Sequence, residues 1–207
     1  MSLTVASEEI AGSPEFRHLS SIAGIQVDLR YATDNNFVGR DLYSPYDCAW
    51  LHVEAASALE KVVAWLAARR PDLTPLVLDA LRPQRVQQQL WDALEGTGLQ
   101  MYLANPERGS IHSYGMALDI TLLDADGREL DMGTGFDDMT NRSHPALEEG
   151  FLQAGAFQRI PQLLLHALRT QGVQHQRGQV GTARGQPGHH FLEGAGGVDV
   201  QPGAVVG

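Results

Sequence analysis

One short segment, residues 110–123, constrains the fold of this chain more than any other. It carries the pattern Ser-x-His-x-x-Gly-x-Ala-x-Asp, followed by the apolar run at residues 120–123, which is typical of a buried strand. His112 and Asp119 stand seven positions apart, and a straight strand would turn them to opposite faces. Because Gly115 between them permits a bend, we expect His112 on a loop that folds back beside Asp119.

The two side chains of this segment suit a metal ion. Neutral imidazole and carboxylate are both good ligands for a zinc-type ion. The alternative is an ordinary surface histidine and a strand-end aspartate, and a bare pair at this spacing does not decide between them. The chain has a single cysteine, Cys48, so a cluster of thiolate ligands is excluded. A metal site must therefore rest on His, Asp or Glu.

Helix and strand patterns alternate along the chain. Apolar residues recur at helical spacing over residues 51–70, where Ala, Leu, Glu and Lys are frequent and Pro71 ends the pattern. Further patterns predict a strand at 25–31, a buried strand at 73–79, a helix at 83–94, a hairpin turn at 124–128 and a helix at 161–170. This order predicts an α+β fold, a single domain with a small antiparallel sheet flanked by helices.

The composition divides the chain into three parts. Residues 1–20 are expected to be a polar, weakly structured lead-in, and residues 21–171 the folded domain. Hydrophobic residues make up 43% of the chain and charged residues 19%, which fits a globular protein with a core. From residue 172 to 207, Gly, Gln and Val dominate and large side chains are rare. We expect a poorly ordered tail there, since little apolar surface offsets the cost of ordering it.

The charge balance and the apolar runs limit the partners. The formal net charge of −10 argues against a nucleic-acid partner, because phosphate contacts need clustered Lys and Arg. No apolar run approaches the length that crosses a bilayer, so no membrane partner is expected. The first residues show neither a basic segment nor an apolar core of a secretory signal. We expect a cytoplasmic location, or a periplasmic one if a leader was removed.

Four other residues are candidates for chemistry. Arg82 lies between a predicted strand and a predicted helix, where an arginine can hold an anion, although on position alone a surface arginine in a loop is the more common case. Asp137 follows a Gly-rich loop and could meet a substrate amine or cap a turn. Ser110 and Tyr31 could each donate a hydrogen bond to a carboxylate or carbonyl.

The sequence resembles the D-alanyl-D-alanine dipeptidases, which belong with the D,D-peptidase and LAS-type metallopeptidases. The segment at 110–119 is similar to the zinc motif of that family. Three more segments match in order: Asp-Leu-Arg-Tyr-Ala-Thr at 28–33, Asp-Ala-Leu-Arg-Pro at 79–83, and Met-Gly-Thr-Gly-Phe-Asp at 132–137. Four ordered motifs favour the metal interpretation of His112 and Asp119 over the surface alternative.

The resemblance implies a role for each candidate. His112 and Asp119 would be two ligands of one zinc ion per chain, and Arg82 would stabilise the negative charge that develops on the substrate. Asp137 would bind the substrate ammonium group, while Ser110 and Tyr31 would line the pocket of a small dipeptide.

The chain departs from the family pattern after Asp137. The family carries Glu-x-Trp-His there, whose Glu is the general base and whose His is the third zinc ligand, and no Glu-x-x-His occurs here. The segment Gly-His-His-Phe at 188–191 is only loosely similar, which leaves His189 and His190 as weak substitutes for the third ligand. The change in composition suggests the hypothesis of a shifted reading frame near residues 171–175, which resequencing of the gene would test.

Three functions follow from these observations. The first is zinc-dependent hydrolysis of D-Ala-D-Ala to D-alanine, impaired here because the base and the third ligand are not identified. The second is a related murein D,D-carboxypeptidase or L,D-endopeptidase, acting on longer peptides. The third is a binding module that holds zinc or D-Ala-terminated peptides without turnover.

Overall fold

The central strand of the fold is β4 (Thr74–Asp79), which the computed structural model places between two partners. The structure describes residues 7–140. Within them the helices are α1 (Ser7–Ile10), α2 (Val53–Arg69) and α3 (Gln84–Ala93), and the strands are β1 (Phe16–His18), β2 (Gln26–Val27), β3 (Trp50–His52), β4 and β5 (Asp119–Leu123). Short 3-10 turns connect several of them.

The main sheet has three strands in the order β2-β4-β5. β2 runs parallel to β4, and β5 runs antiparallel to it with Thr74 opposite Leu123 and Asp79 opposite Asp119. The α+β class is confirmed, although this sheet is mixed and only the separate β1-β3 pair is wholly antiparallel. The register brings the two aspartates together at one end of the sheet.

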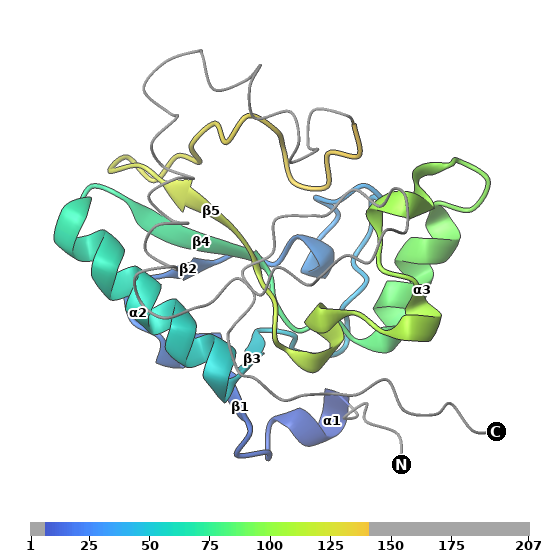
Figure 1. Ribbon diagram of the computed structural model, residues 1–207, viewed down its shortest axis with the longest axis horizontal. Helices are drawn as coiled ribbons and strands as arrows, with labels where there is room; N and C mark the ends of the chain where they lie inside the picture. Colours follow the sequence, from blue (N-terminus) through green and yellow to red (C-terminus); the bar gives the residue numbers. More distant parts are fainter. Residues whose placement is uncertain (1–6, 141–207) are drawn as a thin grey trace, which may run out of the picture.

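Helix α2 lies along the three-stranded sheet (Figure 1). Helix α3 lies beyond the C-terminal end of β4. The inner face of α2 buries Leu59, Val62 and Leu66, as the helical spacing predicts. Its first turn is capped by the imidazole of His52, which accepts a hydrogen bond from the backbone N–H of Glu54 at 3.3 Å. The helix predicted at 51–70 is therefore found, shorter by two residues at its start because β3 extends to His52.

The N-terminal part of the described chain is more ordered than its composition indicates. The composition predicts a weakly structured lead-in over residues 1–20, and within its described part, 7–20, Phe16–His18 pairs with Trp50–His52 as β1 with β3. Ile10 and Phe16 are buried and Leu19 is fully buried, so these few apolar side chains anchor the segment. A few apolar side chains are enough to order this segment, because pairing with β3 satisfies the backbone hydrogen-bonding groups of β1.

The strand predicted at 25–31 is shorter than expected. Only Gln26–Val27 forms β2, and Arg30–Ala32 is a 3-10 turn. The turn sends the ring of Tyr31 into the core with no exposed surface, while Arg30 forms ion pairs with Asp28 and Glu129. Burial of the aromatic ring therefore overrides the alternating pattern.

The hairpin turn predicted at 124–128 is found after β5. The backbone N–H of Asp124 donates to the carbonyl of Arg128 at 2.9 Å, and Leu123 bridges to Glu129. The helix predicted at 161–170 and the tail predicted at 172–207 lie outside the described residues.

Residues 7–140 contain no helix that is long and apolar enough to cross a bilayer. The expected cytoplasmic or periplasmic location stays a prediction.

Candidate active site

His112 lies on a 3-10 turn, Ile111–Tyr114, that leads into β5. The hydroxyl of Ser110 accepts a hydrogen bond from the backbone N–H of His112 at 3.3 Å and so caps the turn. Gly115 ends it with a φ of 65°, a conformation that glycine adopts without strain. The bend expected between His112 and Asp119 is therefore present.

The imidazole of His112 is held in one orientation. Its Nδ1 lies 3.0 Å from the backbone carbonyl oxygen of Ala80, which can only accept a hydrogen bond. Nδ1 therefore carries the proton, and Nε2 of the neutral ring offers a lone pair. Nε2 lies 3.7 Å from Oδ1 of Asp119, and the His112 side chain is almost wholly buried. A histidine fixed in this way by a backbone carbonyl is typical of a metal ligand.

The pair formed by His112 and Asp119 fits a zinc ion. Two ligand atoms of a tetrahedral site, each about 2.0 Å from the metal, lie about 3.3 Å apart. The separation of 3.7 Å between Nε2 and Oδ1 is close to that value. Burial raises the pKa of Asp119 to about 8, and the charge of Asp79 adds to this effect. A bound cation would favour the charged carboxylate of Asp119 and so lower its pKa.

A third acidic residue, Asp79, belongs to the same cluster. Within residues 7–140, Asp79, His112 and Asp119 form the one group of three side chains whose ligand atoms lie within 4.8 Å of one another. Asp79 is fully buried, and its oxygens accept hydrogen bonds from the Tyr43 hydroxyl, the backbone N–H of Ala80 and Arg82. It also lies on the Nδ1 side of His112, at 3.4 Å, opposite the lone pair. These contacts suit an orienting carboxylate better than a metal ligand.

Arg82 is a buried cation directly beside this cluster. Its Nε and Nη2 donate to Oδ2 of Asp79 at 2.9 and 2.5 Å, and its Nη1 donates to Oε1 of Gln87 at 3.1 Å. Nη2 lies 3.7 Å from Oδ2 of Asp119, and the guanidinium stacks over the ring of Tyr31. Burial lowers the pKa of Arg82, but the charges of Asp79, Tyr31, Tyr43 and Asp119 together outweigh it and keep that pKa well above its ordinary value. Arg82 therefore stays charged.

Asp137 meets the site from the Gly-rich loop. The hydroxyl of Tyr31 lies 2.8 Å from Oδ2 and 3.0 Å from Oδ1 of Asp137, so it donates to this carboxyl group. Burial raises the pKa of Asp137 to about 6, while Arg82 and the Tyr31 hydroxyl oppose the shift. The backbone of Asp137 has a φ of 57°. A positive φ is uncommon for residues other than glycine, and it recurs at functional sites.

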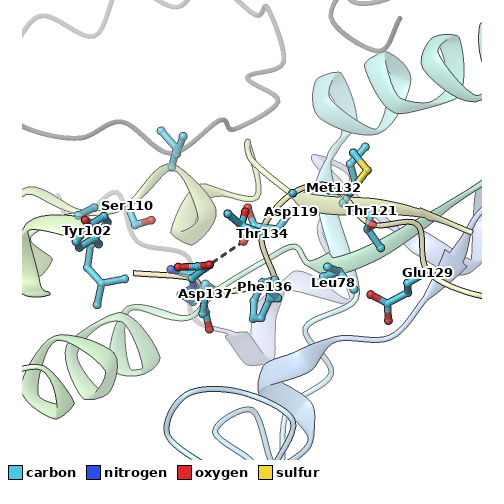
Figure 2. A pocket seen from close by; sticks show the side chains of 18 of the residues that line it. Leu78, Tyr102, Ser110, Asp119, Thr121, Glu129, Met132, Thr134, Phe136 and Asp137 are labelled. Atoms are coloured by element: carbon cyan, nitrogen blue, oxygen red, sulfur yellow. Dashed lines mark ion pairs between the residues drawn. The ribbon is translucent and has the colours of Figure 1, made fainter. Parts of the chain in front are cut away.

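A cavity of about 770 Å³ connects these groups. Ser110 and Tyr102 lie at one end, Thr121, Met132 and Glu129 at the other, and Asp119 and Asp137 between them (Figure 2). Its polar lining includes Arg82, Ser110, Asp119 and Asp137. Predicted site residues from distant parts of the sequence therefore meet at one hollow.

Not every predicted residue reaches this cavity in the same way. Tyr31 has no exposed surface and reaches the site through its hydrogen bond to Asp137. His112 is also buried, with Nε2 near Asp119. The weak substitutes for a third ligand, His189 and His190, lie outside the described residues. The individual roles of the six predicted residues stay predictions.

Two buried polar residues, Asp79 and Gln87, were not predicted as part of the site. Asp79 stands in the Asp-x-x-Arg-Pro segment, so its nearness to Arg82 along the sequence was an available signal. Gln87 is one of several glutamines on a polar-looking helix, and no sequence feature separates it from its neighbours.

The fold and the site together define an α+β domain with a His–Asp pair suited to a metal ion, beside a buried arginine. Residues 15–179 match the D-Ala-D-Ala dipeptidase family of peptidases, and the chain belongs to that family. It is 39% identical over 120 residues to the D-alanyl-D-alanine dipeptidase of Escherichia coli (strain K12). That similarity covers 58% of this chain and 59% of the relative. The predicted catalytic domain, 21–171, lies within the family match, and its boundaries stay a prediction.

Proposed function

We propose that this chain is a zinc-dependent dipeptidase that hydrolyses D-Ala-D-Ala to D-alanine. The observation that carries the proposal is the pair of Nε2 of His112 and Oδ1 of Asp119, 3.7 Å apart, beside Arg82 in a chain of this family. The relative from Escherichia coli is a D-alanyl-D-alanine dipeptidase, which supports the same substrate.

His112 and Asp119 would hold the zinc ion through Nε2 and a carboxylate oxygen. When bound, zinc supplies a Lewis acid that polarises a peptide carbonyl and activates a water molecule. The Ala80 carbonyl keeps the proton of His112 on Nδ1, so the ligand nitrogen is ready before any metal arrives.

Arg82 would stabilise the negative charge that develops on the carbonyl oxygen of the scissile bond. Its charge is fixed, and its guanidinium is held on Asp79 and Gln87, so little reorganisation is needed during the reaction. Its Nη2 lies within 3.7 Å of Asp119, which puts the positive charge next to the proposed metal ligand.

Asp137 would bind the free ammonium group of the dipeptide. The Tyr31 hydroxyl donates to its carboxylate and fixes its orientation, and Ser110 adds a polar group at one end of the cavity. A charged anchor for a free amine favours a short substrate, because a longer peptide would carry an uncharged amide at that point.

The experiment compares D-Ala-D-Ala with its N-acetylated form, using the purified chain with zinc and following release of D-alanine. We expect hydrolysis of the free dipeptide alone, slow because no Glu-x-x-His follows Asp137 to provide the general base. Equal hydrolysis of both would contradict the ammonium anchor. Preferred cleavage of a capped pentapeptide would instead support the murein carboxypeptidase or endopeptidase.

The second candidate is a binding module that holds zinc or D-Ala-terminated peptides without turnover. The missing Glu-x-x-His after Asp137 favours it. Calorimetry that shows binding of D-Ala-D-Ala, together with no release of D-alanine, would support this candidate over the dipeptidase.

A further inference from the structure

Gln87 is a fully buried polar side chain in the first turn of α3. Its carbonyl oxygen accepts a hydrogen bond from Nη1 of Arg82 at 3.1 Å. Its amide nitrogen donates to the backbone carbonyl of Ala104 at 2.7 Å. Both halves of the amide are thus used, and each partner lines the cavity.

The bond from Gln87 restrains a movement of Arg82 that Asp79 alone would allow. Asp79 holds Nε and Nη2 through a single oxygen, Oδ2, and the ring of Tyr31 lies under the guanidinium, but neither contact holds Nη1. Gln87 holds the opposite corner, Nη1. Hydrogen bonds on both sides of the guanidinium restrict its rotation about Oδ2 more than the bonds to Oδ2 alone.

The other end of Gln87 connects this arginine to the wall of the cavity. Ala104 precedes the 3-10 turn Pro106–Arg108, and the segment continues to Ser110 and His112. The backbone N–H of Arg82 also donates to the carbonyl of His112 at 3.0 Å. Movement of Gln87 would therefore change the position of Arg82 relative to the segment that carries the metal-ligand candidate.

We propose that Gln87 is a positioning residue that sets the orientation of the Arg82 guanidinium toward the reacting carbonyl. The inference rests on the proposed dipeptidase function. Gln87 is not one of the described residues that line the cavity. It would therefore act through Arg82 and Ala104 and not by touching the substrate.

Gln84 provides a matched control on the same helix. Its amide nitrogen donates to the backbone carbonyl of Pro106 at 2.6 Å, so it ties α3 to the same segment as Gln87. Its hydrogen bonds go to Pro106 and Ser113, and none of them involves Arg82. The variants Gln87→Met and Gln84→Met therefore remove similar contacts to the segment, but only the first releases Nη1.

The kinetic test measures kcat and KM for D-Ala-D-Ala in both variants. For Gln87→Met we expect kcat to fall about 10- to 100-fold with KM within about twofold, the size of effect that a misplaced catalytic group produces. Gln84→Met should keep kcat within about threefold of the unmodified chain, since Arg82 stays anchored. Equal losses of kcat in the two variants would overturn the proposal.

Two further variants separate positioning from stability. Gln87→Glu keeps an oxygen that accepts from Nη1 but loses the donor to the Ala104 carbonyl, so recovery of kcat relative to Gln87→Met would support the contact to Nη1. Combining Gln87→Met with Arg82→Lys should cost little more than Arg82→Lys alone, because both act through one group. If the losses of kcat in the two single variants simply multiply in the double variant, the positioning role is contradicted.

A readout that needs no turnover is the rotation of the Arg82 Nη1 amino group, followed by NMR. We expect rotation about the Cζ–Nη1 bond to be at least about tenfold faster in Gln87→Met than in Gln84→Met, because the hydrogen bond that restrains it is lost. Unchanged rotation would overturn the inference. If the unmodified chain releases no D-alanine, the proposed function fails, and this measurement still decides whether Gln87 holds Arg82.

Discussion

At the scale of single residues, the site depends on which atom of His112 carries a proton. The Ala80 carbonyl accepts a hydrogen bond from Nδ1–H, so the lone pair of Nε2, near Asp119, can bind a metal. Asp79 lies on the other side of the ring, where it orients Arg82. Two aspartates of the same cluster thus have different surroundings and, we infer, different tasks.

Loss of either proposed ligand should abolish stoichiometric zinc binding. We expect His112→Ala and Asp119→Ala to weaken zinc affinity at least about 100-fold, since one protein ligand of a small set is removed. Metal content after dialysis, measured by mass spectrometry, checks this. The exposed Asp126→Ala is the control and should retain zinc. Retention of one equivalent in both site variants would show that the metal lies elsewhere.

Binding of the substrate ammonium should depend on the charge of Asp137. Burial raises its pKa to about 6, so the carboxylate is charged above that pH and neutral below it. KM for D-Ala-D-Ala should therefore rise as the pH falls through 6, by about tenfold per pH unit once Asp137 is protonated.

The Tyr31→Phe variant tests the same contact. The Tyr31 hydroxyl lowers the pKa of Asp137 by donating to its charged form, so its removal should move the rise in KM to higher pH. Profiles of KM against pH for the two proteins check this, and coincident profiles would exclude a role for the hydroxyl.

At the scale of elements, the turn that carries His112 needs glycine at its end. Gly115 has a φ of 65°, and a Cβ there would lie 2.9 Å from Cε1 of Phe16 and 3.0 Å from the backbone nitrogen of His52. The turn therefore packs directly against β1 and β3. This contact explains how the N-terminal strand pair supports a site at the end of the main sheet.

Gly115→Ala should lower the free energy of unfolding by more than about 2 kcal/mol, because the left-handed conformation costs about 1–2 kcal/mol and the contact with backbone adds to it. Gly127→Ala is the matched control, with a φ of 76° and no atom within 4 Å of the added Cβ. It should lose only the conformational part. Urea unfolding curves of both variants check the difference, and equal losses would contradict the packing explanation.

The sequence predicts the helices and strands better than it predicts the contacts between them. The long helix and the strands before Arg82 and after Asp119 follow from periodicity, and their residues fix them locally. The partnership of Phe16–His18 with β3 depends on a distant strand and has no local signal. The link between Gln87 and Arg82 spans only five positions, but the sequence does not show which glutamine of α3 turns inward, because that depends on the packing of α3 against the segment that carries Ala104.

At the scale of the whole molecule, one core supports the site. The largest cluster of buried side chains joins α2, β4, α3 and the turn that carries Tyr31. The ring of Tyr31 contacts Tyr43 and Phe136, with ring centres 5.9 and 5.5 Å apart, so the loop that holds Asp137 is packed on the same core. Folding of the core and assembly of the site should therefore occur together.

Cys48, the single cysteine, reports on this core. It is buried, and burial raises the pKa of its thiol to about 12, so the unreactive thiol form persists at ordinary pH. We expect Ellman's reagent at pH 8 to react at least about 100-fold more slowly with the native chain than in denaturant. Rapid stoichiometric reaction of the native chain would show that this part of the core opens readily.

The most direct test of the metal site titrates zinc into metal-free protein while D-alanine release from D-Ala-D-Ala is measured in the same sample. We expect activity, slow in absolute terms, to rise in proportion to bound zinc up to one equivalent and to be lost in Asp119→Ala. Hydrolysis that persists in a chelator, or that is unchanged in Asp119→Ala, would contradict a site built on His112 and Asp119.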